Sequence, residues 1–135
     1  MTDLIAVVVR DSLLYEKVSD EQLLTLFFPK RTITARELIR ERVSQEVKAY
    51  NERQPEVFRG LIAPSNSERV LNGYRLPKKR EVNSEAQCKL ALQAFQENGF
   101  ILLVDERQVS KLDDQIELRP ETSVVFLKLT PLVGG

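Results

Sequence analysis

The chain has 135 residues, enough for one domain with a hydrophobic core, and its 20 basic residues balance its 20 acidic residues. This balance gives no overall field that would attract nucleic acid or an anionic membrane. Histidine is absent and Cys88 is the single cysteine, which excludes a Ser-His or Cys-His pair, an internal disulfide and the usual zinc ligands. We expect a cytoplasmic protein that is not an enzyme, has no metal or cofactor of its own, and binds neither nucleic acid nor membrane.

The first part of the chain predicts two strands and a helix. The apolar run at residues 4–9 is too short for a typical helix and indicates a strand covered on both faces, with parallel neighbours. A second strand is predicted at residues 23–28. Thr34 and Glu37 have capping-box spacing and open a helix that should end near Asn51. The apolar stripe of this helix comprises Ala35, Leu38, Ile39, Val43, Val47 and Tyr50.

Residues 52–83 are interrupted by prolines and glycines, but their apolar positions favour a folded insertion over a disordered linker. The basic cluster Lys78-Lys79-Arg80 is read as a nuclear signal, as a phosphate-binding spot or, the interpretation that we favour, as a solvated loop.

A second helix is predicted from Ser84 to about Asn98, because Ser84 and Gln87 repeat the capping-box spacing and Gly99 supplies a stop. Cys88 lies on its apolar face. We therefore expect a buried structural thiol there, rather than a catalytic cysteine like that of conjugating enzymes, which needs an exposed, electropositive setting.

The last part of the chain predicts three strands, at residues 100–104, 107–109 and 124–129. Asp105-Glu106 should form the turn between the first two. Residues 112–116 indicate a single helical turn with Leu112 and Ile116 pointing inward. The whole order predicts an α+β fold in which helices pack on one mixed sheet.

Two stretches resemble ubiquitin-like β-grasp proteins. The segments FILLVDERQV, LDDQI and RPETSVVFLKL, followed by the final Gly-Gly, are similar to the second half of ubiquitin. LLTLFFPKRTITARELI, residues 23–39, is similar to the strand, proline and threonine-capped helix of the same family. The resemblance, which is strongest to bacterial ubiquitin-like modifiers, implies one β-grasp domain over residues 1–129. It further implies an insertion at about 52–99, before the third strand, and a flexible tail over 130–135.

The resemblance also implies a function for the Gly-Gly end. An activating enzyme would use ATP to adenylate the carboxylate of Gly135, and Gly134 and Gly135 allow close approach because they lack Cβ atoms. The activated glycine would then pass through thioesters to a target amine. The implied partners are an activating enzyme, a conjugating enzyme, a deconjugating protease and the target proteins.

The tail leaves alternatives open. Pro131, Leu132 and Val133, which the activating enzyme would recognise, are closer to the tails of sulfur carriers, whose acyl-adenylate becomes a thiocarboxylate. The insertion favours the modifier, because such carriers are compact. A ubiquitin-like interaction module that is never conjugated is the third alternative.

The alternation of the last strand suggests a docking patch. Val125, Leu127 and Leu129 alternate with Val124, Phe126 and Lys128. If the first set faces the helix, Val124 and Phe126 face outward and form part of an apolar patch for the activating enzyme. The alternative is that the insertion covers these two side chains.

Overall fold

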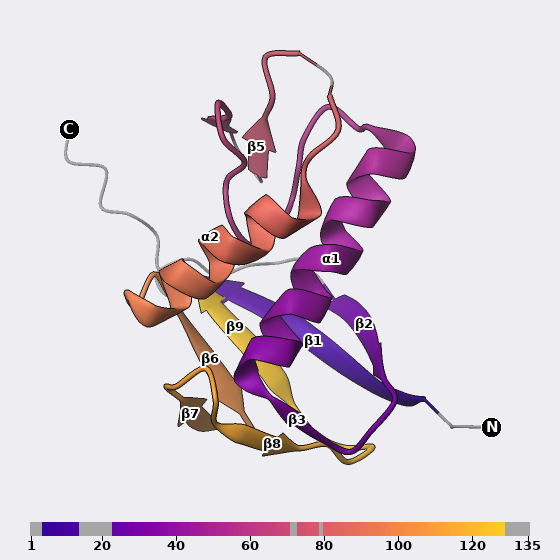
Figure 1. The fold of residues 1–135 in the computed structure, drawn as a ribbon, viewed down its shortest axis with the longest axis vertical. Helices are drawn as coiled ribbons and strands as arrows, with labels where there is room; N and C mark the ends of the chain where they lie inside the picture. Colours follow the sequence, from indigo (N-terminus) through magenta and orange to yellow (C-terminus); the bar gives the residue numbers. More distant parts are fainter. Residues whose placement is uncertain (1–3, 14–22, 71–72, 79, 129–135) are drawn as a thin grey trace. The chain divides into compact units, whose positions relative to one another are not determined.

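The computed structural model describes residues 4–13, 23–70, 73–78 and 80–128 (Figure 1). This part of the chain is α+β, with two helices and a mixed five-stranded sheet. It divides into two compact units. Unit 1 comprises residues 1–37 and 94–135, and unit 2 comprises residues 38–93.

The main sheet belongs to unit 1 and has the order β2-β1-β9-β6-β7. In Figure 1 the yellow strand β9 (Val124–Lys128) lies between the indigo β1 (Ile5–Leu13) and the orange β6 (Phe100–Val104). β9 is parallel to β1 and antiparallel to β6. The flanking strands β2 (Leu23–Phe28) and β7 (Arg107–Val109) pair in the antiparallel sense with β1 and β6. The prediction of parallel neighbours for the first strand is therefore confirmed for β9 and wrong for β2.

The two faces of this sheet differ in exposure. In β1, Val7 and Val9 are buried whereas Val8 is 45% exposed. The prediction that this strand is covered on both faces is therefore wrong. An unbroken apolar run shows that both faces of the strand are apolar. Only contacts from elsewhere in the fold decide which of the two faces is buried.

Aromatic side chains form part of the core on the inner face of the sheet. The ring centroids of Phe95 and Phe100, and those of Phe100 and Phe126, are each 5.8 Å apart in tilted arrangements. All three side chains are buried. Such pairs add to the stabilisation that comes from burial alone.

A second, two-stranded sheet in unit 1 pairs β3 (Thr32–Thr34) with β8 (Gln115–Glu117). The predicted helical turn over 112–116 is wrong, because the chain turns at Leu112-Asp113 and then extends into β8. Leu112 and Ile116 are nevertheless buried, as predicted. Ile116 is directly opposite Ile33, so a partner more than eighty residues away determines the conformation.

Helix α1 (Ala35–Arg53) begins as the sequence predicts. The Thr34 hydroxyl accepts a hydrogen bond from the Glu37 N–H at 3.2 Å, and the Glu37 carboxylate accepts one from the Thr34 N–H at 3.4 Å. The next amides of the first turn, Ala35 and Arg36, donate to the carbonyls of Asp114 and Leu112. All six residues of the predicted apolar stripe are buried.

Helix α2 (Ser84–Gln96) is correctly predicted, but both of its caps differ from the prediction. The side chain of Asn83, not Ser84, accepts from the Ala86 N–H at 2.8 Å. At the other end Asn98 has the left-handed φ of 60°, and the Gly99 N–H donates to the Ala94 carbonyl at 2.7 Å. This is a Schellman arrangement with asparagine in the place where glycine is usual.

The segment between the helices is folded, as predicted. In unit 2, β4 (Glu68–Val70) and β5 (Gly73–Arg75) form a hairpin, and Phe58 pairs with Tyr74 beside it. The Phe58 ring packs edge-on against Tyr50 of α1, with centroids 5.2 Å apart. This aromatic contact anchors the hairpin to the unit 2 part of α1.

Candidate docking face and carboxyl-terminal strand

Strand β9 is held on both sides at the centre of the main sheet. Val124 is opposite Val9 on β1 and Val104 on β6, and Lys128 is opposite Leu13 and Phe100. At its end, the Lys128 ammonium lies 3.4 Å from the Asp11 carboxylate. The predicted site residues Pro131, Leu132, Val133, Gly134 and Gly135 lie outside the described residues. The structure therefore fixes the strand that precedes them, up to Lys128.

The predicted docking patch on this strand is wrong. Val124 is 1% exposed and Phe126 is 0% exposed, so both side chains belong to the core. Lys128 shares their side of the strand, which makes that side look solvent-facing in the sequence. Its charge is instead accommodated at the strand end beside Asp11. The outward side chains of β9 are Val125 and Leu127, which are half-buried.

The outer face of the main sheet is apolar over several strands. The register places Val125 beside Leu103 of β6 and Arg10 of β1, and Leu127 beside Ile101 of β6. On the same face of β1 and β2, Val8 is exposed, and Leu23 and Phe27 are 60% and 52% exposed. Arg10 lies between Leu23 and Val125 on this face. We call this surface the outer apolar face; it comprises Ala6, Val8, Leu23, Phe27, Ile101, Leu103, Val125 and Leu127. Apolar side chains gathered on one exposed sheet face make it a candidate interaction site.

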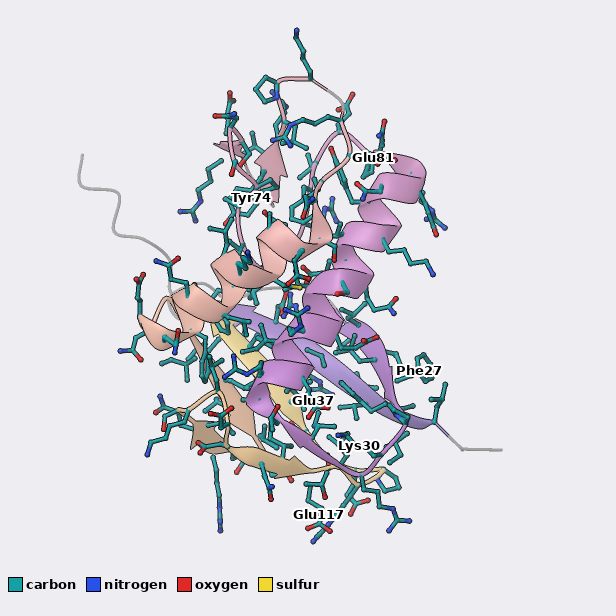
Figure 2. The ribbon with its side chains drawn as sticks, in the orientation of Figure 1. Phe27, Lys30, Glu37, Tyr74, Glu81 and Glu117 are labelled. Carbon is teal, nitrogen blue, oxygen red and sulfur yellow. The ribbon has the colours of Figure 1, made fainter. Side chains whose placement is uncertain are left out.

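Phe27 is the largest side chain of this face. Figure 2 shows its ring beside β2, which is an edge strand of the sheet. The strand reads LLTLFF and contains no charged residue, although edge strands are commonly protected by charges. The lack of charge in this strand can be recognised in the sequence. The sequence does not show that Phe27 points outward while Phe28 is buried.

Cys88 is buried, as predicted, among polar groups of unit 2. Its thiol donates to the Arg40 carbonyl at 3.8 Å and lies 3.8 Å from the Ser44 hydroxyl. The Ser84 hydroxyl donates to that of Ser44 at 3.4 Å. These contacts join α1 to α2 within unit 2, in keeping with a structural thiol.

An exposed ion pair reinforces the same pairing of helices. The Arg40 guanidinium donates to both carboxylate oxygens of Glu85, at 3.1 and 2.9 Å. These hydrogen bonds lower the pKa of Glu85 and raise the pKa of Arg40. Asn51 adds a further link: its side chain donates to the Val82 carbonyl and accepts from the Val82 N–H.

A buried ionic cluster fixes the loop that follows α1. Arg42, which is buried, contacts Glu46 at 2.5 Å, and the other Glu46 oxygen accepts from the Leu61 N–H at 3.0 Å. Gly60 completes the arrangement, because a Cβ there would lie 2.2 Å from the Phe58 ring. The sequence pattern places Arg42 on the polar side of α1 and gives no sign of this burial.

Of the predicted basic cluster, Lys78 and Arg80 are described and both are exposed. The Arg80 guanidinium donates to the Ser65 carbonyl. Lys79 lies outside the described residues.

Within the described ranges, no group of three or more Cys, Asp or Glu side chains is arranged to hold a metal ion. In the same part of the chain, neither helix is long and apolar enough to cross a membrane.

Comparisons of the chain with protein-family models, with curated proteins and with solved structures found no match.

Proposed function

We propose that this chain is a ubiquitin-like protein modifier with a β-grasp fold in unit 1. A partner activating enzyme uses ATP to adenylate the Gly135 carboxylate, and the acyl group then passes through thioesters to an amine of a target protein. The chain is the substrate of these steps, and its partners supply the catalytic groups.

The observation that carries this proposal is the central, parallel β1–β9 pair. It supports a β-grasp arrangement, in which the first and last strands of a mixed sheet lie side by side. β9 is held by neighbours on both sides as far as Lys128, seven residues before Gly135. Seven residues of extended chain span up to about 23 Å, enough to carry a carboxylate into the active site of another protein.

The outer apolar face provides a docking surface for the activating enzyme in this proposal. It replaces Val124 and Phe126, which are buried. Val125 and Leu127 are the outward residues of the strand that leads to the tail, so binding at this face would hold the tail close to the enzyme.

The test is intact-mass analysis after incubation with the cognate activating enzyme, its conjugating enzyme, ATP and candidate target proteins. The modifier predicts adducts of higher mass, each linked through Gly135, and their complete loss when Gly135 is deleted. The mass of the protein isolated from its own cells must also show that Gly135 carries a free carboxylate. Adducts that persist in the deletion variant would contradict the proposal.

A sulfur carrier is the second candidate, favoured by Pro131, Leu132 and Val133 before Gly-Gly. With a sulfur donor in the same assay, this function predicts a mass gain that matches exchange of one carboxylate oxygen for sulfur. That result, without protein adducts, would replace the modifier with the carrier.

The docking surface is tested separately, by ATP–pyrophosphate exchange. Val8→Ser with Phe27→Ser should raise the KM for this protein roughly tenfold, because each removes exposed apolar contact area. The matched control is Leu90→Ser, which alters another exposed apolar side chain, on α2 in unit 2. An equal KM increase in the control would refute a docking role for the outer apolar face.

A further inference from the structure

Opposite charges are concentrated in the two units. Unit 2 carries eleven basic and seven acidic residues, a net charge of +4, whereas unit 1 carries nine basic and thirteen acidic residues, a net charge of −4. The zero net charge of the chain therefore conceals a basic unit and an acidic unit. Charges farther away than the screening length, about 10 Å at 0.1 M salt, contribute little, so local charge rather than total charge governs the binding of a small ligand.

The excess positive charge of unit 2 is concentrated around its hairpin. Between residues 53 and 80, six described basic side chains are exposed and only two acidic ones accompany them, Glu56 and Glu68. We call the six the cationic surface; they are Arg53, Arg59, Arg69, Arg75, Lys78 and Arg80. Among the described residues none of the six lies within ion-pair distance of a carboxylate.

The backbone holds three of these arginines on adjacent segments. Phe58 and Tyr74 exchange two backbone hydrogen bonds, of 2.7 and 2.9 Å. Arg59 and Arg75, which follow them, therefore lie on neighbouring segments. Arg69 is directly opposite Tyr74 on the other strand of the hairpin, so the alternation of side chains places Arg69 on one face of the hairpin and Arg75 on the other. Figure 2 labels Tyr74 within this hairpin. Phe58 is buried against Tyr50, so the segments that carry the arginines are fixed to the unit 2 part of α1.

The approach of these segments depends on Gly73. A Cβ at this position would lie 2.5 Å from the Phe58 carbonyl oxygen. The backbone positions of these arginines are therefore fixed, which lowers the entropic cost of binding an extended partner. Five of the six residues are arginine, whose guanidinium binds carboxylates through paired hydrogen bonds.

We propose that the cationic surface binds an acidic protein segment, that is, a run of Asp and Glu side chains on a partner. Charge complementarity identifies the partner as an anion, and the composition of the molecule favours carboxylates over a nucleic acid. A nucleic acid is a long polyanion that extends beyond the screening length, and the zero net charge of the whole chain gives it no overall attraction. A short acidic segment responds to the local excess of positive charge. The surface acts independently of the activation of Gly135.

The experiment is fluorescence anisotropy of a labelled oligoglutamate peptide with the full chain. Binding should be measurable at about 0.02 M salt and much weaker at about 0.2 M. Arg59→Gln, Arg69→Gln and Arg75→Gln together should weaken it roughly tenfold, because each replacement removes one exposed ion pair with the peptide. The matched control is Arg31→Gln, Arg107→Gln and Lys111→Gln, three exposed charges of unit 1 whose removal should leave binding unchanged.

Three results would overturn the proposal: no more binding of oligoglutamate than of oligolysine, equal weakening in the unit 1 control, or tighter binding of a single-stranded oligonucleotide that the unit 2 variant abolishes. Circular dichroism establishes that each variant is folded. Should the glutamine variant unfold, lysine replacements at the same three positions keep the charge and must retain most of the affinity.

Discussion

The interactions inside the two units of this protein differ, and so do the surfaces that the two units expose. Unit 1 is organised by strand pairing between distant parts of the sequence, and it exposes an apolar sheet face. Unit 2 combines the buried apolar side chains of α1 with polar contacts such as the Arg42–Glu46 cluster, and it exposes cations. The surfaces that we propose for recognition therefore differ in their chemistry: the one in unit 1 is apolar and the one in unit 2 is cationic.

The largest expected effect concerns the two faces of the unit 1 sheet. Phe126→Ala should lower the free energy of unfolding by about 3–5 kcal/mol, because it leaves a cavity where a side chain of 0% exposure was packed. Phe27→Ala, on the outer apolar face, should change it by about 0.5 kcal/mol or less. Urea denaturation followed by circular dichroism measures both. Equal losses would mean that the inner and outer faces are wrongly assigned.

Glu46→Gln tests the polar cluster of unit 2 in the same way. Removing the negative charge beside the buried Arg42 guanidinium should cost about 2–4 kcal/mol, somewhat below the full cost of breaking a buried ion pair because Glu46 is partly exposed. Hydrogen exchange should rise first around Leu61, whose N–H donates to Glu46. The control is Glu52→Gln, an exposed carboxylate on the same helix. If both variants behave alike, the cluster does not stabilise unit 2.

Gly60→Ala probes the close packing of the loop against the same helix. The new Cβ would lie 2.2 Å from the Phe58 ring and 2.9 Å from a Glu46 oxygen, so we expect a loss of about 1–3 kcal/mol by overpacking. Gly99→Ala serves as the control in unit 1, because its nearest contact, the Ala94 carbonyl oxygen, is 3.2 Å away and needs only a small shift. Thermal unfolding should give a lower Tm for Gly60→Ala than for Gly99→Ala. The reverse order would refute the steric account.

The smallest expected effect is the pH dependence of the Arg40–Glu85 pair. The pKa of Glu85 is lowered in the folded state from its ordinary value of 4.5, so its contribution to stability is complete above that value. The contribution disappears as the pH falls through the lowered pKa. Arg40, whose pKa is raised, stays protonated throughout and adds no pH dependence in this range.

Glu85→Gln should therefore lower Tm slightly at pH 7, and the difference from the unaltered protein should vanish well below pH 4.5. Tm measured across this range checks the prediction. A difference that grows toward acid pH would contradict the direction of the shift.

Local sequence signals determined much of the fold because their causes are local. The Thr34–Glu37 capping box depends on residues three positions apart, and the apolar stripe of α1 depends on helical spacing alone. The strands at residues 23–28, 100–104 and 107–109 were predicted with the bounds that they have. The N-terminal cap of α2 was predicted at the wrong residue, because the neighbouring residues Asn83 and Ser84 are both able to cap.

The tertiary structure alone decided which side of each strand is buried and which distant segments meet. In β9 both sets of alternating side chains are largely apolar, so periodicity cannot distinguish Val125 from Phe126. The β3–β8 pairing and the burial of Arg42 likewise arise from contacts between segments far apart in the sequence. The chemistry of Gly135 was inferred from the sequence. The strand that leads toward it, and the apolar face beside that strand, were defined by strand pairing.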